Sequence, residues 1–142
     1  MSGRIHKRGG RGQALVEFAL VLPVLILVLI AVFDIGRLVF AYNDITNAAR
    51  QGVRVAIVDQ TTNLAQTKTI EQATSLGLKP GDVTVTYLKP DLSGACSPLV
   101  LGCVADIKVD YAWQAITPII GGLIGPMTVT SETRMPIERI YP

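Results

Sequence analysis

A single carboxylate, that of Glu17, lies near the start of an otherwise uncharged apolar run, QALVEFALVLPVLILVLIAVF, at residues 13–33. A carboxylate well inside a membrane helix costs on the order of 2.5 to 3.5 kcal/mol, so such a residue is expected to have a partner. Proteolysis after Gly12 would create one, because the new α-amine of Gln13 would lie four residues before Glu17, at the positive end of the helix dipole. Alternatively, Glu17 extends to the lipid headgroups from its place one turn into the helix. Charge alone leaves both interpretations open.

The apolar run is long enough to cross a membrane. Its 21 residues, 13–33, would extend about 31 Å as a helix, which is roughly the thickness of a hydrocarbon core. Four basic residues precede it and none lies inside it, which predicts a cytoplasmic N-terminus and an external C-terminus. We expect a leader at residues 1–12, a membrane-spanning helix at 13–33 and an extracytoplasmic domain at 34–142. The alternative, a cleaved secretory signal peptide, is disfavoured because DIGRLVFAYN, which follows the run, contains no convincing small-x-small cleavage site.

The residues beyond the apolar run form no catalytic pattern. His6 is the only histidine and lies on the other side of the predicted membrane, which excludes a Ser-His-Asp or Cys-His arrangement and leaves a metal without enough ligands. Asp106 and Asp110, on a predicted strand, would be about 13 Å apart, too far to act on one bond, and are expected to be solvated. Nine basic residues against 11 acidic ones remain after the leader, so no basic footprint for nucleic acid is present. We predict a protein that is not an enzyme and that binds no metal, cofactor, small-molecule substrate or nucleic acid.

Two cysteines, Cys96 and Cys103, enclose six residues of a turn-rich loop. The predicted topology places them outside the cytoplasm, where disulfides persist. A bridge between them is expected to clasp the loop and to stabilise it by about 2 kcal/mol. Two free cysteines are the alternative.

The helix is predicted to continue beyond the membrane to about Val58, because apolar residues recur there at helical spacing. This stripe narrows to small side chains at Ala49, Gly52 and Ala56, which would let another element approach closely. We expect that element to be the sheet of the same domain, with a partner subunit as the alternative. Arg50 and Arg54, one turn apart, are interpreted as a solvated face, although they could contact acidic residues of a partner.

The remaining chain is typical of an α+β fold. A second helix is predicted from Thr61 or Thr62 to Leu76, closed by Gly77. Strands are predicted at residues 82–88, 103–113 and about 127–135, and in the second strand Ile107, Val109, Tyr111 and Trp113 alternate with polar residues. The expected fold is a long N-terminal helix and a short second helix packed on a small, about three-stranded antiparallel sheet. The apolar segment 116–125 is expected either to cover the sheet edge or to meet a partner.

The start of the chain resembles a known processing signal. GQALVEF, from Gly12 to Phe18, resembles the prepilin processing site of the type IV pilin superfamily, with a short basic leader, a glycine before the cut and a glutamate at the fifth mature position. The pair Glu17 and Phe18 is similar to the signature of the Tad/Flp (type IVc) branch. From Gly12 to about Arg54, including the NAARQGVR block, the chain resembles the TadE-like family of minor pilins or pseudopilins.

The resemblance implies a function in assembly. A prepilin peptidase would cut between Gly12 and Gln13 and would read Glu17 and Phe18, and the amine of Gln13 would then form an assembly charge pair with Glu17. Pro23 would act as a helix break, and the outer domain would be pilin-like. Expected partners are the peptidase, other pilins, the assembly platform of the bacterial inner membrane and the lipid bilayer, with extraction into a surface pilus. The alternative function is a permanently membrane-anchored scaffold or binding subunit of a secretion apparatus.

Overall fold

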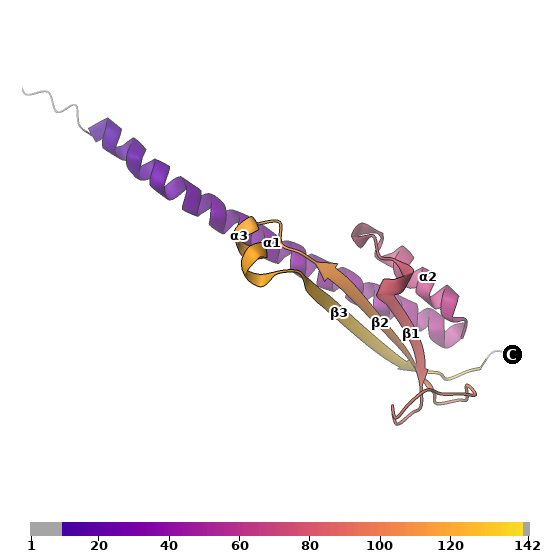
Figure 1. Cartoon of the computed structure of the whole chain (residues 1–142). Helices are drawn as coiled ribbons and strands as arrows, with labels where there is room; N and C mark the ends of the chain where they lie inside the picture. The colour runs from indigo at the N-terminus through magenta and orange to yellow at the C-terminus, as the bar shows by residue number, and fades with distance from the viewer. Residues whose placement is uncertain (1–9, 141–142) are drawn as a thin grey trace, which may run out of the picture.

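The structure, a computed structural model, describes residues 10–140 and is dominated by one long helix. This helix, α1, runs from Gly10–Val58, and its 49 residues extend about 73 Å. Its C-terminal half carries the rest of the chain, whereas its N-terminal half projects away from the domain (Figure 1). The predicted continuation of the helix to Val58 is therefore confirmed.

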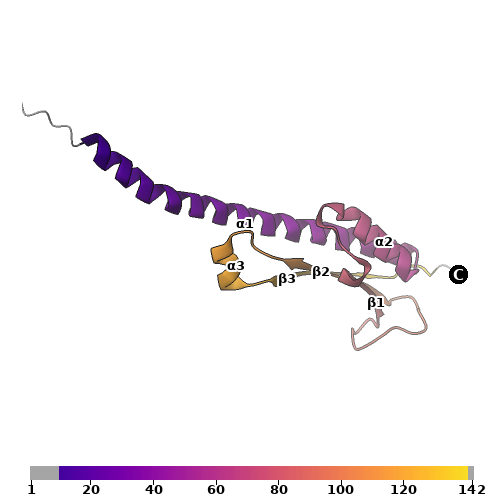
Figure 2. The same cartoon turned by 45° about the horizontal axis from the view of Figure 1, so that its top comes forward.

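Pro23 lies inside α1, and the helix continues on both sides of it. A proline removes one N–H donor from the helical ladder, here the partner of the Ala19 carbonyl, and leaves the other hydrogen bonds in place. In the structure α1 is therefore continuous through Pro23, and the role of Pro23 as a helix break stays a prediction. Figure 2 shows only a gentle curvature in the indigo half of α1, so a kink at Pro23 within a filament stays a prediction.

Three antiparallel strands form the sheet, in the order β1-β2-β3. Their bounds are Val83–Leu88 for β1, Val104–Trp113 for β2 and Met127–Pro136 for β3. The central strand pairs Val109 with Val83 on one side and Tyr111 with Val129 on the other. The predicted apolar face of β2 is confirmed, because Ile107, Val109 and Trp113 are buried and Tyr111 is half-buried against the core.

The other helices are short. Helix α2 spans Thr62–Gln72, and a 3₁₀ turn, Thr74–Leu76, follows it before Gly77 ends the segment in the left-handed conformation. The predicted second helix therefore ends four residues early as an α-helix, because Ala73 leaves helical geometry. A second 3₁₀ turn, Pro80–Asp82, leads into β1. The 116–125 segment contains a short helix that the sequence did not predict, α3, at Pro118–Ile124.

Helices α1 and α2 lie together on one face of the sheet (Figure 2). Small side chains of α1, Ala48, Ala49 and Ala56, are fully buried at this contact. Gly52 lies so close to its neighbours that an added Cβ atom would be 1.9 Å from Thr69 Oγ1 of α2 and 2.9 Å from Ile107 Cδ1 of β2. The small stripe thus contacts the sheet of the same domain, as predicted, and α2 as well. The result is an α+β, pilin-like arrangement.

Candidate functional site

The N-terminal half of α1 offers its whole apolar surface to the surroundings. Leu20, Leu29 and Phe33, for example, are all exposed, and the most apolar stretch has no residue buried within the protein. Within residues 10–140, α1 is the one helix that is long and apolar enough to cross a membrane. An exposed apolar surface of this size is unfavourable in water, as is typical of a membrane anchor or of a signal sequence.

The predicted processing residues lie together on the first turns of α1. Gly12 is in open space, and Glu17 and Phe18 are exposed. Gln13 and Glu17, four positions apart, lie on the same side of the helix one turn from each other. Cleavage of the peptide bond after Gly12 would therefore place the new α-amine of Gln13 within one turn of the Glu17 carboxylate. The predicted leader lies, for residues 1–9, outside the described residues.

A buried carboxylate that the sequence did not indicate, that of Asp34, lies at the base of the domain. Its Oδ2 atom accepts hydrogen bonds from the backbone N–H of Thr117 at 3.0 Å and from the Thr117 hydroxyl at 2.6 Å. Its Oδ1 atom accepts the N–H of Ile116 at 3.1 Å and is paired with Arg37 at 3.4 Å. We call these four residues the Asp34 clamp. It ties α1 to the chain that enters α3.

Electrostatics favour the charged form of Asp34. The Thr117 hydroxyl and then the Thr117 N–H, helped by Ile116 and Arg37, lower the pKa of Asp34 to about 2, against the opposite effect of burial. Sequence signals could not have found the clamp, because Asp34 and Thr117 are 83 residues apart. The only hint was that Asp34 is the first charged residue after the apolar run.

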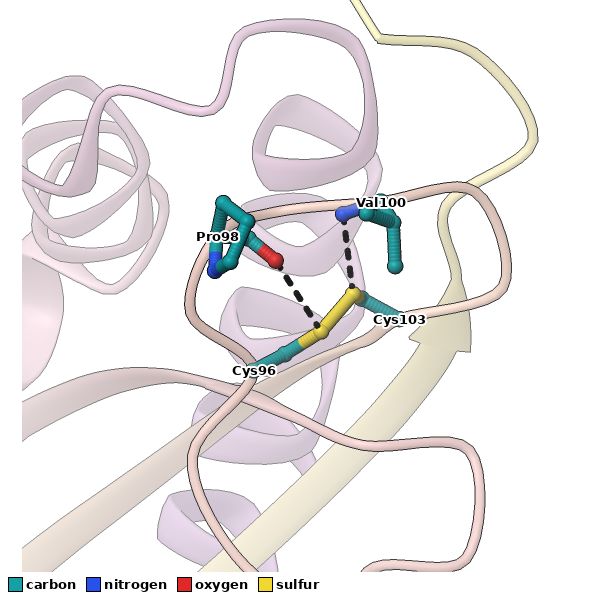
Figure 3. The surroundings of a disulfide bond; sticks show 4 residues. All are labelled: Cys96, Pro98, Val100 and Cys103. Carbon is teal, nitrogen blue, oxygen red and sulfur yellow. Dashed lines mark hydrogen bonds between the residues drawn. A yellow bond between two sulfur atoms is a disulfide. The ribbon is translucent and has the colours of Figure 1, made fainter.

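The cysteines form the predicted disulfide. Cys96 and Cys103 are bridged, with their Cα atoms 6.1 Å apart, and the bridge closes the loop between β1 and β2 (Figure 3). The Val100 N–H donates to Cys103 Sγ at 3.2 Å, and the Pro98 carbonyl oxygen lies 3.8 Å from Cys96 Sγ. This loop is at the end of the sheet that is remote from the N-terminal half of α1 (Figure 1).

Reduction of this disulfide is expected to lower the free energy of unfolding of the domain by about 2 kcal/mol, because the unfolded chain loses a closed loop. The measurement is urea unfolding of the full chain in detergent, followed by the fluorescence of the single tryptophan, Trp113, which is buried. A Cys96→Ala/Cys103→Ala variant is the control, since reductant should leave it unchanged. Equal unfolding midpoints for the oxidised and reduced wild-type chain would contradict the expected role.

The polar face of the sheet differs from expectation at one residue. Asp110 is half-buried and pairs with Lys108, but Asp106, which we expected to be solvated, is 8% exposed. Arg134 of β3, which lies opposite Asp106 in the register, covers it and pairs with it at 3.5 Å. Burial, and then repulsion from Glu132, raise the pKa of Asp106. This is a structural ion-pair network on the sheet.

Further along α1, Arg50 and Arg54 are exposed, as expected for a solvated face. Together with Gln72 of α2 they line a shallow polar depression. No group of three or more His, Cys, Asp or Glu residues in the described part of the chain could hold a metal ion.

Comparison with protein families gives a match over most of α1. The model of the family described as TadE-like protein matches residues 12–54. The matched segment begins at the glycine of the predicted cleavage site and ends on α1, four residues before the helix does. Comparisons with curated proteins and with solved structures give no match.

Proposed function

We propose that the chain is a minor pilin or pseudopilin, and the match of residues 12–54 to the model of the TadE-like protein family supports this. It is made as a membrane-anchored precursor, processed by a prepilin peptidase and used to assemble a Tad/Flp (type IVc) pilus or a related secretion system. The observation that carries the proposal is a glutamate, Glu17, one turn beyond the candidate cleavage bond on a fully exposed apolar helix. The protein is the substrate of the processing reaction and has no catalytic role of its own.

Processing would give the Glu17 carboxylate a positive charge nearby. A cut between Gly12 and Gln13 releases an α-amine that is positively charged near neutral pH. In a low-dielectric environment this amine and the Glu17 carboxylate stabilise each other's charged forms, either within one chain or between neighbouring chains. Before the cut, no such cation exists at residue 13. The cleaved chain is therefore the form suited to leave the bilayer and to dock against other helices.

The domain geometry is compatible with this role. Residues 13–33 would anchor the precursor in the inner membrane, with the N-terminus in the cytoplasm and residues 34–142 outside. The same apolar surface of α1 that faces lipid in the precursor is free to face other subunits after extraction. The disulfide of the outer loop fits an oxidising compartment.

The second candidate is a permanently anchored scaffold subunit of a secretion apparatus. It is favoured by the Asp34 clamp, which joins the domain to α1 immediately after the apolar run. A scaffold of this kind would use the apolar helix only as an anchor.

Fractionation of cells that express the full chain separates these two functions. Surface filaments are sheared off, and the chain is quantified in the sheared material and in the inner membrane. The minor-pilin function predicts that the chain is found in both fractions, and that it disappears from the sheared fraction when the prepilin peptidase is deleted. Confinement to the membrane in both strains would contradict it and favour the anchored scaffold.

A further inference from the structure

The segment around α3 is an uncharged, exposed apolar surface. No residue between Tyr111 and Ser131 carries a charge. On this segment Leu123 is 86% exposed, Ile116 is 62% exposed and Ile124 is 54% exposed. We call these three residues the α3 patch. Leu123 and Ile124 also line one pocket, and exposed apolar side chains that gather in this way are typical of an interaction surface.

The α3 patch lies at a defined position along the axis of α1, which we call its height. Ile124 and Leu123 share an apolar pocket with Ala31, Ile35 and Leu38 of α1. Figures 1 and 2 both place α3 at the end of the sheet that faces the projecting half of α1. The Asp34 clamp fixes this height, because it bonds the residues that enter α3 directly to α1.

This height corresponds to the outer surface of a bilayer. If residues 13–33 span the hydrocarbon core, the headgroup region extends beyond it by about 5–8 Å, or about three to five helical residues. The pocket that α3 shares with α1 runs along residues 31–38 of α1, so it covers the end of the predicted span and the headgroup interval beyond it. Asp34 does not disturb this placement, because its carboxylate is only 1% exposed and is bonded within the protein.

The apolar surface of α1 also continues through this interval. Ile35, Val39 and Phe40 lie beyond the predicted span and remain more than half exposed. The α3 patch therefore widens, on a second element, an apolar surface that α1 already presents at the same height. A surface that is continuous with a membrane-spanning helix and carries no charge is suited to lipid.

We propose that α3 is a second membrane-contacting element, and that the α3 patch inserts into the outer headgroup region of the bilayer while the precursor is anchored. The partner is the lipid surface. This inference rests on the anchored precursor of the proposed function. Together with α1 and the Asp34 clamp, α3 would hold the domain at a fixed orientation on the membrane, and extraction of the subunit would have to pull the α3 patch out of lipid.

Spin labels on the full chain test this insertion. The chain is reconstituted in vesicles of phosphatidylethanolamine and phosphatidylglycerol, with Cys96 and Cys103 oxidised, and single cysteines are introduced and labelled. Leu123→Cys reports on the α3 patch and Leu27→Cys on the predicted span. Leu101→Cys, an exposed leucine in the remote disulfide loop, is the matched control. Collisions of each label with oxygen, which concentrates in lipid, and with a water-soluble nickel chelate are then compared.

We expect the ratio of oxygen to nickel collisions to be several-fold higher at residues 27 and 123 than at residue 101. A lipid value at residue 27 with an aqueous value at residue 123 would overturn the α3 insertion and leave the anchor intact. An aqueous value at residue 27 would overturn the anchor itself, and the insertion with it. A label at residue 123 that is shielded from both reagents, with spin–spin broadening that grows with the protein-to-lipid ratio, would assign the patch to a second subunit and overturn the lipid proposal.

Discussion

Gly52→Ala is expected to destabilise the domain by about 2 kcal/mol, as typically observed when a close contact is overpacked. The new methyl group would be placed 1.9 Å from Thr69 Oγ1 and 2.9 Å from Ile107 Cδ1, so α2 and β2 would both have to move. Thr69 is fully buried and donates a hydrogen bond to the Ala65 carbonyl at 2.8 Å, which it would lose on rotating away. Urea unfolding of the full chain in detergent, followed by Trp113 fluorescence, measures the effect.

Gly36→Ala is the matched control for this substitution. Gly36 lies on the same helix, and an added Cβ atom would meet nothing within 4 Å. Alanine should therefore be neutral there, or stabilise the helix by up to about 1 kcal/mol through its higher helix propensity. Adding Thr69→Ala to Gly52→Ala should recover part of the loss, because it removes the closest clash. Equal stabilities for the Gly52 and Gly36 variants would contradict the close packing of α1 on α2.

Asp34→Asn is expected to loosen the attachment of α3 to α1 and to lower the unfolding midpoint at neutral pH. The amide retains the size of the carboxylate but loses its charge, and its NH₂ group would face N–H donors of Ile116 or Thr117. Glu71→Gln is the control. It removes a carboxylate from an exposed ion pair with Lys68, and such pairs contribute little to stability.

The stabilisation of the fold by the Asp34 carboxylate should also decrease as the pH falls. The pKa of Asp34 is lowered in the folded chain from 3.8 to about 2, so the folded state binds this proton less tightly than the unfolded state does. The stabilisation is therefore complete above about pH 4 and is lost as the pH falls toward 2. The difference in midpoint between wild type and Asp34→Asn should shrink over this interval. A difference that stays constant from pH 6 to pH 2 would contradict the clamp.

Periodicity predicted the later part of α1 and the strand β2 well, because each of them buries one face of apolar side chains. The spacing of apolar residues located the end of α1, and the alternation in β2 identified the face on which Ile107 and Val109 are buried. The disulfide followed from topology, because the predicted compartment favours it and the two cysteines are near in sequence. In each case a local pattern contained the necessary information.

Contacts between distant residues could not be predicted in the same way. The partner of Asp34 is Thr117, and no local pattern connects the two. The burial of Asp106 depends on the register that places Arg134 opposite it, and this register is not encoded in β2 alone. Helix α3 was missed because glycines and a proline interrupt its sequence, whereas its position depends on Asp34. The contacts of Asp34, the burial of Asp106 and the position of α3 all depend on tertiary structure.

Processing at Gly12 is the central claim, and intact mass spectrometry of the chain from its native membrane tests it most directly. The measurement is made with and without the prepilin peptidase, and on Gly12→Ala. We predict a mature chain that begins at Gln13, that is absent without the peptidase and that fails to form in Gly12→Ala. A chain that keeps its leader in every strain, or one that begins near Asp34 as after signal peptidase cleavage, would contradict the claim and remove the assembly role of Glu17.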